Sequence, residues 1–145
     1  MTGYDLSMST SSNIRPSLMR AAASMIFIVD DDADIREALV GQLNSADYDA
    51  TSFASPEDFL DAAIPDVPAC VLVDVHMPGM SGFDLQAALA ERGRTLPLIF
   101  MTAFGTIPMT VRAMKAGALE FLTKPLDERE MLSAIETALA RDAEQ

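Results

Sequence analysis

Acidic side chains that could hold a cation follow two short apolar stretches of this 145-residue chain. Asp30 and Asp31 come directly after the apolar residues 25–29, and Asp74 comes directly after the apolar residues 69–73. Carboxylates held close together repel one another strongly unless a cation neutralises them or one of them takes up a proton. Oxygen ligands in a small, partly hydrated site favour Mg²⁺. A fold that brings these carboxylates together is therefore expected to bind magnesium.

Thr102 and Lys124 could add phosphoryl chemistry to such a site. Thr102 follows the apolar residues 96–101, and Lys124 lies just beyond the apolar residues 118–122. A carboxylate next to a metal ion and a fixed ammonium group can attack phosphorus and form an aspartyl phosphate. The metal ion and Lys124 would then stabilise the negative charge on the phosphoryl oxygens. These residue types predict phosphoryl transfer to an aspartate, provided that they converge.

The elements that must position these residues alternate along the chain. Apolar runs of strand length predict strands at residues 25–29, 48–53, 69–73, 96–101 and 118–122. Apolar spacing and capping residues predict a helix after each strand: one with Ile35, Leu39 and Leu43 on a single face, one that starts at Ser55 and stops before Pro65, one over residues 83–91, one over residues 106–116, and one that starts at Asp127 and buries Leu132, Ile135 and Leu139. Continuous apolar strands between helices are typical of an α/β fold with a parallel sheet covered on both faces. We expect the flavodoxin-like strand order 2-1-3-4-5, which places ligands at the carboxyl ends of the strands.

Composition narrows the class of protein and its partners. Half of the residues are apolar, 22% are charged, and the formal net charge is −12. This charge disfavours direct binding to nucleic acid and docking on anionic lipid, and no apolar run approaches the ~20 residues that span a bilayer. The single cysteine, Cys70, excludes an internal disulfide and a multi-cysteine metal site. It also favours a reducing, cytoplasmic location.

The chain is expected to hold one folded domain. Residues 1–24 are rich in serine and show no apolar periodicity, so we expect a disordered tail there. A transit peptide, or a true start at Met8, Met19 or Met25, remains open for this segment. The folded domain is expected over residues 25–142, with residues 143–145 as a C-terminal end.

Four motifs together resemble a bacterial two-component response-regulator receiver domain. They are Ile-Val-Asp-Asp-Asp at 28–32, Val-Asp-Val-His-Met-Pro-Gly-Met-Ser-Gly at 73–82, Met-Thr-Ala at 101–103, and Lys-Pro at 124–125. Each motif alone is weak, but all four occur in order at the expected strand ends. Residues 108–118 are most similar to receivers of the NarL/FixJ group. The resemblance implies a signalling phosphoacceptor domain of a phosphorelay rather than an enzyme with an external substrate.

The resemblance also implies a role for each residue of the metal site. Asp74 would be the phosphoacceptor, and a sensor histidine kinase or a histidine phosphotransfer protein would supply the phosphoryl group. Asp31 would bind Mg²⁺ directly together with Asp74, and Asp30 would act partly through water. His76 would contribute its backbone carbonyl to the metal.

Further roles concern the phosphoryl group and a conformational switch. Thr102 and Lys124 would bind the phosphoryl oxygens, and a cis peptide bond is expected between Lys124 and Pro125. Phe121 would turn inward when Thr102 moves. The face made by the fourth helix, the fifth strand and the fifth helix, at about residues 106–142, would then control a partner, a phosphorylation-dependent homodimer or a missing output domain.

Simpler interpretations stand beside these roles. Asp32 fits an N-cap of the first helix better than a place in the site, and Phe121 could be an ordinary strand aromatic. Phe104, two residues after Thr102, lies where the family tunes phosphoryl lifetime, and otherwise it is a surface hydrophobe. Cys70 lies inside a predicted strand and is expected to be buried and inert.

Three other classes of protein compete with the receiver as interpretations of the sequence. An aspartyl phosphatase of the haloacid dehalogenase type carries a second acid two residues after its nucleophile, and His76 stands there. A flavodoxin shares the fold, but the acids after the first strand would repel the phosphate of its flavin cofactor. A DNA-binding factor of this group carries a helix-turn-helix domain after the receiver. The chain ends at Gln145, so either the receiver stands alone or an output domain has been removed.

Overall fold

The computed structural model of this chain describes residues 23–93 and 95–144. Five parallel strands form one sheet in the order β2-β1-β3-β4-β5. The strands are β1 (Met25–Val29), β2 (Ala50–Phe53), β3 (Ala69–Asp74), β4 (Leu98–Thr102) and β5 (Glu120–Thr123). The predicted α/β fold and its strand order are therefore confirmed. The expected disorder of residues 1–24 falls almost wholly outside the described residues.

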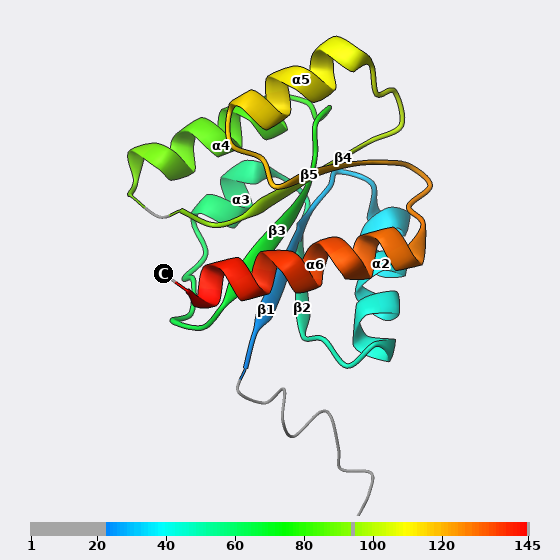
Figure 1. The fold of residues 1–145 in the computed structure, drawn as a ribbon, viewed down its shortest axis with the longest axis vertical. Helices are drawn as coiled ribbons and strands as arrows, with labels where there is room; N and C mark the ends of the chain where they lie inside the picture. The colour runs from blue at the N-terminus through cyan, green and yellow to red at the C-terminus, as the bar shows by residue number, and fades with distance from the viewer. Residues whose placement is uncertain (1–22, 94, 145) are drawn as a thin grey trace, which may run out of the picture.

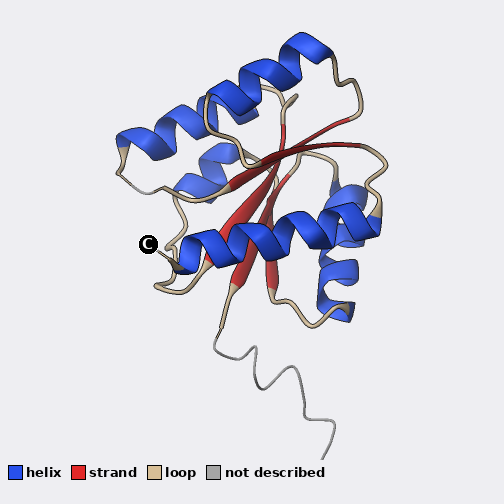
Figure 2. Cartoon of the chain, viewed as in Figure 1, coloured by secondary structure: helices blue, strands red, loops and turns tan. Residues whose placement is uncertain are grey.

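Helices cover both faces of this sheet (Figures 1 and 2). On one face lie α2 (Ala33–Ser45) and α6 (Glu128–Ala143), and on the other lie α3 (Pro56–Leu60), α4 (Gly82–Glu91) and α5 (Ile107–Lys115). Side chains alternate along each strand, so each face has its own buried core. Cys70 and its neighbours on β3 contribute to both cores, and burial raises the pKa of the Cys70 thiol to about 12. That thiol is buried, as the sequence predicts. Among the described residues, no helix has the length and apolar character to cross a membrane.

Polar side chains fix where the helices begin. Asp32 accepts a hydrogen bond from the backbone N–H of Asp34 at 2.9 Å and so caps α2. Ser81 and Asp84 form a reciprocal capping box at the start of α4, which satisfies two N–H groups that the first helical turn leaves free. Ser55 and Asp127 cap α3 and α6, and the side chain of each accepts a hydrogen bond from one backbone N–H of the first turn. Each helix that follows a site loop therefore starts at a fixed residue.

Three strands begin two residues later than the apolar pattern predicts. β2 begins at Ala50 because the N–H of Tyr48 donates to the carbonyl of Leu43 and closes the end of α2. β5 begins at Glu120 because the N–H of Ala118 closes α5 in the same manner, on the carbonyl of Ala113. β4 begins at Leu98, directly after Pro97, whose nitrogen cannot donate to a neighbouring strand.

The buried stripe of α6 also differs from the prediction. Ile135 is fully buried as expected, whereas Leu132 and Leu139 are only partly buried. The other side chains of α6 that are buried against the sheet are Met131, Ala134, Ala138 and Asp142. Two of these are alanines, which let the helix backbone lie close to the sheet and leave the two leucines at the margins of the contact. The prediction chose the large apolar side chains of α6, whereas small side chains form part of the buried stripe.

Candidate functional site

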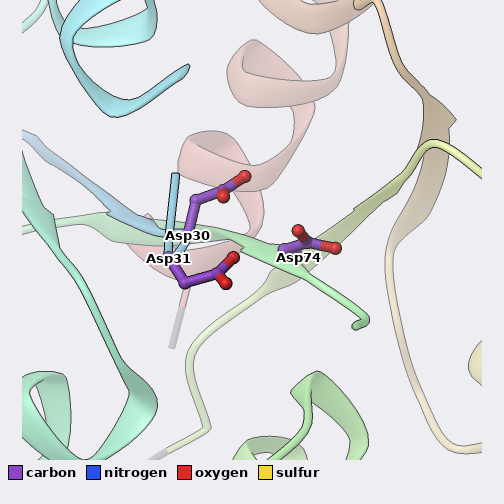
Figure 3. Close-up of side chains that lie close together, drawn as sticks. All are labelled: Asp30, Asp31 and Asp74. Atoms are coloured by element: carbon purple, nitrogen blue, oxygen red, sulfur yellow. The ribbon is translucent and has the colours of Figure 1, made fainter. Parts of the chain in front are cut away.

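Three carboxylates meet at the carboxyl ends of β1 and β3. Carboxylate oxygens of Asp30, Asp31 and Asp74 lie within 4.8 Å of one another (Figure 3). The strand register explains this arrangement, because Val29 pairs with Val73 and the next residue of each strand is an aspartate. Asp30 is fully buried and Asp74 is nearly so, whereas Asp31 is exposed. The site therefore has a buried floor and one side that faces solvent.

Lys124 bridges the two buried carboxylates. Its Nζ donates to Asp30 Oδ2 at 2.6 Å and to Asp74 Oδ2 at 2.9 Å. The backbone N–H of Lys124 donates to the carbonyl of Thr102 at 2.8 Å, which ties the residue to the end of β4. The following peptide bond, Lys124–Pro125, is cis. From this position the lysine side chain reaches from the edge of the sheet to its centre.

Backbone N–H groups hold the remaining oxygens of the buried carboxylates. Asp74 Oδ1 accepts from the N–H of His76 at 3.0 Å, and Asp30 Oδ1 accepts from the N–H of Asp32 at 2.9 Å. Each buried carboxylate thus has one oxygen on the lysine and one on the main chain. Among the described residues, no hydrogen bond or ion pair of the Asp31 side chain is found. Asp31 is the carboxylate that remains free to take a new ligand.

The electrostatics of the site favour one extra positive charge or proton. Burial raises the pKa of Asp74 above its ordinary value of 3.8, while hydrogen bonds from Lys124 and His76 act in the opposite direction and the charge of Asp30 adds to the rise. For Lys124, burial lowers the pKa, but its hydrogen bonds with the two aspartates more than offset burial and the pKa is raised. The lysine stays charged and compensates only one of three carboxylates.

The residues fit a divalent metal. The donor set is oxygen only, is incompletely compensated by Lys124 and is open to water at Asp31, and these are the properties that Mg²⁺ sites share. Zinc prefers cysteine and histidine ligands. Among the described residues, the metal-binding cluster contains neither, and the imidazole of His76 is exposed. Asp32 belongs to the cap of α2 and not to the cluster.

Thr102 and Phe121 lie on β4 and β5, the two strands that follow β3 in the sheet. Thr102 is buried at the end of β4, and its Oγ1 accepts a hydrogen bond from the N–H of Phe104 at 3.1 Å. Phe121 is half-buried, and its ring meets that of Phe100 edge to face with 6.4 Å between centroids. Phe104 is 77% exposed, which fits a surface hydrophobe.

One residue of the site was missed by sequence reasoning. Arg36, on the first turn of α2, donates from Nη1 to the backbone carbonyl of Asp30 at 2.7 Å. This bond holds the acidic loop after β1 against the helix that follows it. A signal was available, because Arg36 is the only lysine or arginine between residues 25 and 91 and stands beside an acidic run.

Comparisons with known proteins agree with this geometry. A family model described as "Response regulator receiver domain" matches residues 26–136. The transcriptional regulatory protein TdiR of Thauera aromatica is 46% identical over 122 residues, which are 84% of this chain and 54% of TdiR. The chain spans about half the length of the curated relatives it matches.

Solved structures give the same answer. The response regulator StyR is similar with a TM-score of 0.78 at 46% identity, and the match covers 83% of this chain and 61% of StyR. The structure titled FixJ-N is similar with a TM-score of 0.75 at 33% identity, and the match covers 81% of this chain and 94% of that one. The predicted similarity to the FixJ-containing group is therefore confirmed.

Proposed function

This chain belongs to the family of response regulator receiver domains, which are signalling modules of two-component systems, and from that premise we propose that Asp74 is its phosphoacceptor. The observation that carries the proposal is the convergence of Asp74 with two further carboxylates and with Lys124 at one end of the sheet. A phosphohistidine of a sensor histidine kinase, or of a histidine phosphotransfer protein, is the proposed donor.

In the proposed transfer, a carboxylate oxygen of Asp74 attacks phosphorus. The new bond joins that oxygen to phosphorus, and the bond that breaks joins phosphorus to the imidazole nitrogen of the donor, which leaves with the electron pair. Before the transfer, Lys124 Nζ lies 2.9 Å from Asp74 Oδ2, so it is within reach of an oxygen of a phosphoryl group on Asp74. The N–H of His76 keeps the other Asp74 oxygen oriented. Positioning and charge stabilisation are the main contributions that such a site makes to phosphoryl transfer.

Asp30, Asp31, Asp74 and the backbone carbonyl of His76 would hold Mg²⁺. When bound, the ion neutralises negative charge on the phosphoryl oxygens and on the carboxylate cluster. Asp31 would be the direct carboxylate ligand besides Asp74, because it is exposed and its side chain has no hydrogen bond or ion pair within the described part of the chain. Asp30 would act partly through water, as the family resemblance implies, and it is fully buried, whereas Asp31 is exposed.

Phosphorylation would be read out through Thr102 and Phe121. A phosphoryl oxygen offers the Thr102 hydroxyl an acceptor, and Thr102 would move toward Asp74 to reach it. Phe121 would then turn into the space that Thr102 leaves. The face made by α5, β5 and α6 would change with it and control a partner, a second copy of the chain or an output domain. We place this signalling role in the cytoplasm.

A direct test is phosphorylation by a small phosphodonor. The chain is incubated with acetyl phosphate and Mg²⁺, and the mass of the intact protein is measured. We expect a gain of one phosphoryl group that requires Mg²⁺ and is absent in Asp74→Asn. Asp84→Asn serves as the control, because Asp84 is an exposed aspartate of the α4 capping box. Phosphorylation that persists in Asp74→Asn, or that never occurs, would reject the assignment.

A further inference from the structure

Gly105 is a glycine that the backbone does not require. Among the described residues, the glycines with a positive φ are Gly79, Gly93 and Gly117. Residues that carry a side chain rarely adopt this backbone conformation. Gly105 is not among these three glycines. It lies in the loop between β4 and α5, three residues after Thr102 and two before α5 begins. Another reason must account for the missing side chain at this position.

Close approach of neighbouring side chains supplies that reason. A Cβ atom built on Gly105 would lie 3.2 Å from Phe121 Cε1 and 3.2 Å from Thr102 Cγ2. It would also lie 3.4 Å from Thr123 Cγ2. The two separations of 3.2 Å are tighter than ordinary carbon–carbon contacts, whereas the separation of 3.4 Å is an ordinary van der Waals contact. The space beside Gly105 is therefore bordered by both residues to which the switch is assigned.

The ring of Phe121 has a rigid wall on another side. Phe100 is fully buried and stands directly opposite Phe121 in the strand register. The Phe100 ring also packs edge to face on Phe83 of α4, with 5.1 Å between centroids. Close-packed rings of this kind do not give way without cost. The free path of the Phe121 ring is thus bounded by Phe100 and by the backbone of Gly105.

We propose that Gly105 is a positioning residue of the switch, whose missing side chain leaves the passage through which the Phe121 ring turns when Thr102 moves toward Asp74. The proposal rests on the switch described under the proposed function. A methyl group at position 105 would stand between the two moving side chains. It would leave the carboxylates and Lys124 untouched, so the phosphoryl chemistry and the ring movement would become uncoupled.

The test follows the Phe121 ring directly in the full chain. Phenylalanine is isotopically labelled in the ring, and the NMR signal of Phe121 is assigned by its loss in Phe121→Leu. Saturating beryllofluoride with Mg²⁺ serves as the mimic of the phosphoryl group. The variants are Gly105→Ala and, as a matched control, Gly41→Ala, since a Cβ at Gly41 meets nothing within 4 Å.

In the wild type and in Gly41→Ala, we expect the mimic to displace the Phe121 signal. In Gly105→Ala, the mimic should still bind, but the displacement of the Phe121 signal should fall to about half of the wild-type value or less. This is the result of a tenfold loss in an equilibrium that favours the inward ring by about 9:1 in the wild type. A second variant, Gly105→Ala with Thr102→Ser, removes the crowded Cγ2 methyl and keeps the hydroxyl. It should regain most of the displacement, which a general loss of stability would not predict.

Failure of this proposal is distinguishable from failure of the switch. A wild-type signal that ignores the mimic overturns the switch and this proposal together. A normal wild-type response with an equal or larger response in Gly105→Ala overturns the role of Gly105 alone. A double variant that stays as unresponsive as Gly105→Ala overturns the shared space with Thr102 and therefore also rejects the proposal.

Discussion

At the scale of single residues, Lys124 decides how three carboxylates can coexist. It is tied to the end of β4 by its backbone and shares its ammonium group between Asp30 and Asp74. Removal of the lysine would leave two buried carboxylates without a compensating charge and is strongly unfavourable. The lysine compensates one negative charge. The uncompensated charge of the other carboxylates gives the site its affinity for a cation or for a phosphoryl group together with a metal ion.

The ionised carboxylate of Asp74 is expected to lower the free energy of unfolding at neutral pH. Its folded pKa is raised above 3.8, chiefly by burial. The folded state therefore holds the proton more tightly, and the free energy of unfolding falls as pH rises through the window from 3.8 to the folded pKa. Asp74→Asn cannot ionise, so it should be more stable than the wild type at neutral pH.

Urea unfolding of both proteins in metal-free buffer, across that window and up to neutral pH, measures this difference. The gap between the two should close as pH falls through the window, because below 3.8 the wild-type carboxyl is protonated in both the folded and the unfolded state. A wild type that is the more stable protein at neutral pH would show that the ion pair with Lys124 outweighs burial.

Asp31 is expected to control the stabilisation of the fold by magnesium. Mg²⁺ that binds only the folded state should raise the free energy of unfolding by about 2.7 kcal/mol at a hundredfold excess over its Kd. In Asp31→Asn most of this gain should vanish, because the exposed carboxylate of the cluster is lost. Asp34→Asn is the control, because Asp34 is an exposed acid on the first turn of α2. Melting with and without Mg²⁺ decides, and an undiminished gain in Asp31→Asn would contradict the metal assignment.

At the scale of elements, the acidic run after β1 divides its work between the site and a helix. Asp30 and Asp31 belong to the carboxylate cluster, and Asp32 caps α2. Asp32→Ala should lower the free energy of unfolding by about 1 kcal/mol. Asp32→Ser should keep most of it, because a serine hydroxyl can accept the same backbone hydrogen bonds. Both variants should keep Mg²⁺ stabilisation and phosphorylation.

Chemical unfolding, together with the intact-mass assay, tests the two halves of this prediction. If Asp32→Ser retained stability but lost phosphorylation, the residue would belong to the site and not only to the cap.

Strand ends could be predicted well and strand starts could not. The apolar runs end in residues with site chemistry, so the pattern correctly placed Asp30, Asp74 and Thr102 at the carboxyl ends of the strands. Starts depend on which N–H groups close the preceding helix, as for Tyr48 and Ala118. Apolar character carries no information on that choice, so three of the five strands were predicted to start too early.

Contacts across the site were predictable only in kind. The positions of the carboxylates and of Lys124 follow from the strand order, but the lysine's division between Asp30 and Asp74 depends on side-chain geometry. Gly105 shows the same limit. Its sequence context is that of any loop glycine, and only the placement of Thr102 and Phe121 around it gives the missing side chain a reason.

At the scale of the whole molecule, one end of the sheet carries the chemistry and one flank carries exposed apolar surface. Ile107, Val111 and Met114 are large hydrophobic residues at helical spacing on α5, and Ile107 is 81% exposed. α5 begins five residues after Thr102 and is connected to it by the loop that contains Gly105. A change at the phosphoacceptor thus has a short covalent route to this surface.

The last prediction is that a phosphoryl mimic promotes dimers through the face of α5, β5 and α6. Burial of apolar side chains supplies the driving force for such an association. Ile107→Glu should weaken the dimer about thirtyfold, since loss of a central apolar contact costs about 2 kcal/mol or more. Gln42→Glu adds the same charge at an exposed position of α2, which lies on the sheet face opposite to α5, and should leave the dimer unchanged. Sedimentation with and without beryllofluoride and Mg²⁺ measures the association. A chain that stays monomeric with the mimic bound would reject the dimer and leave a phosphoryl shuttle or a partner-binding module as the role of this face.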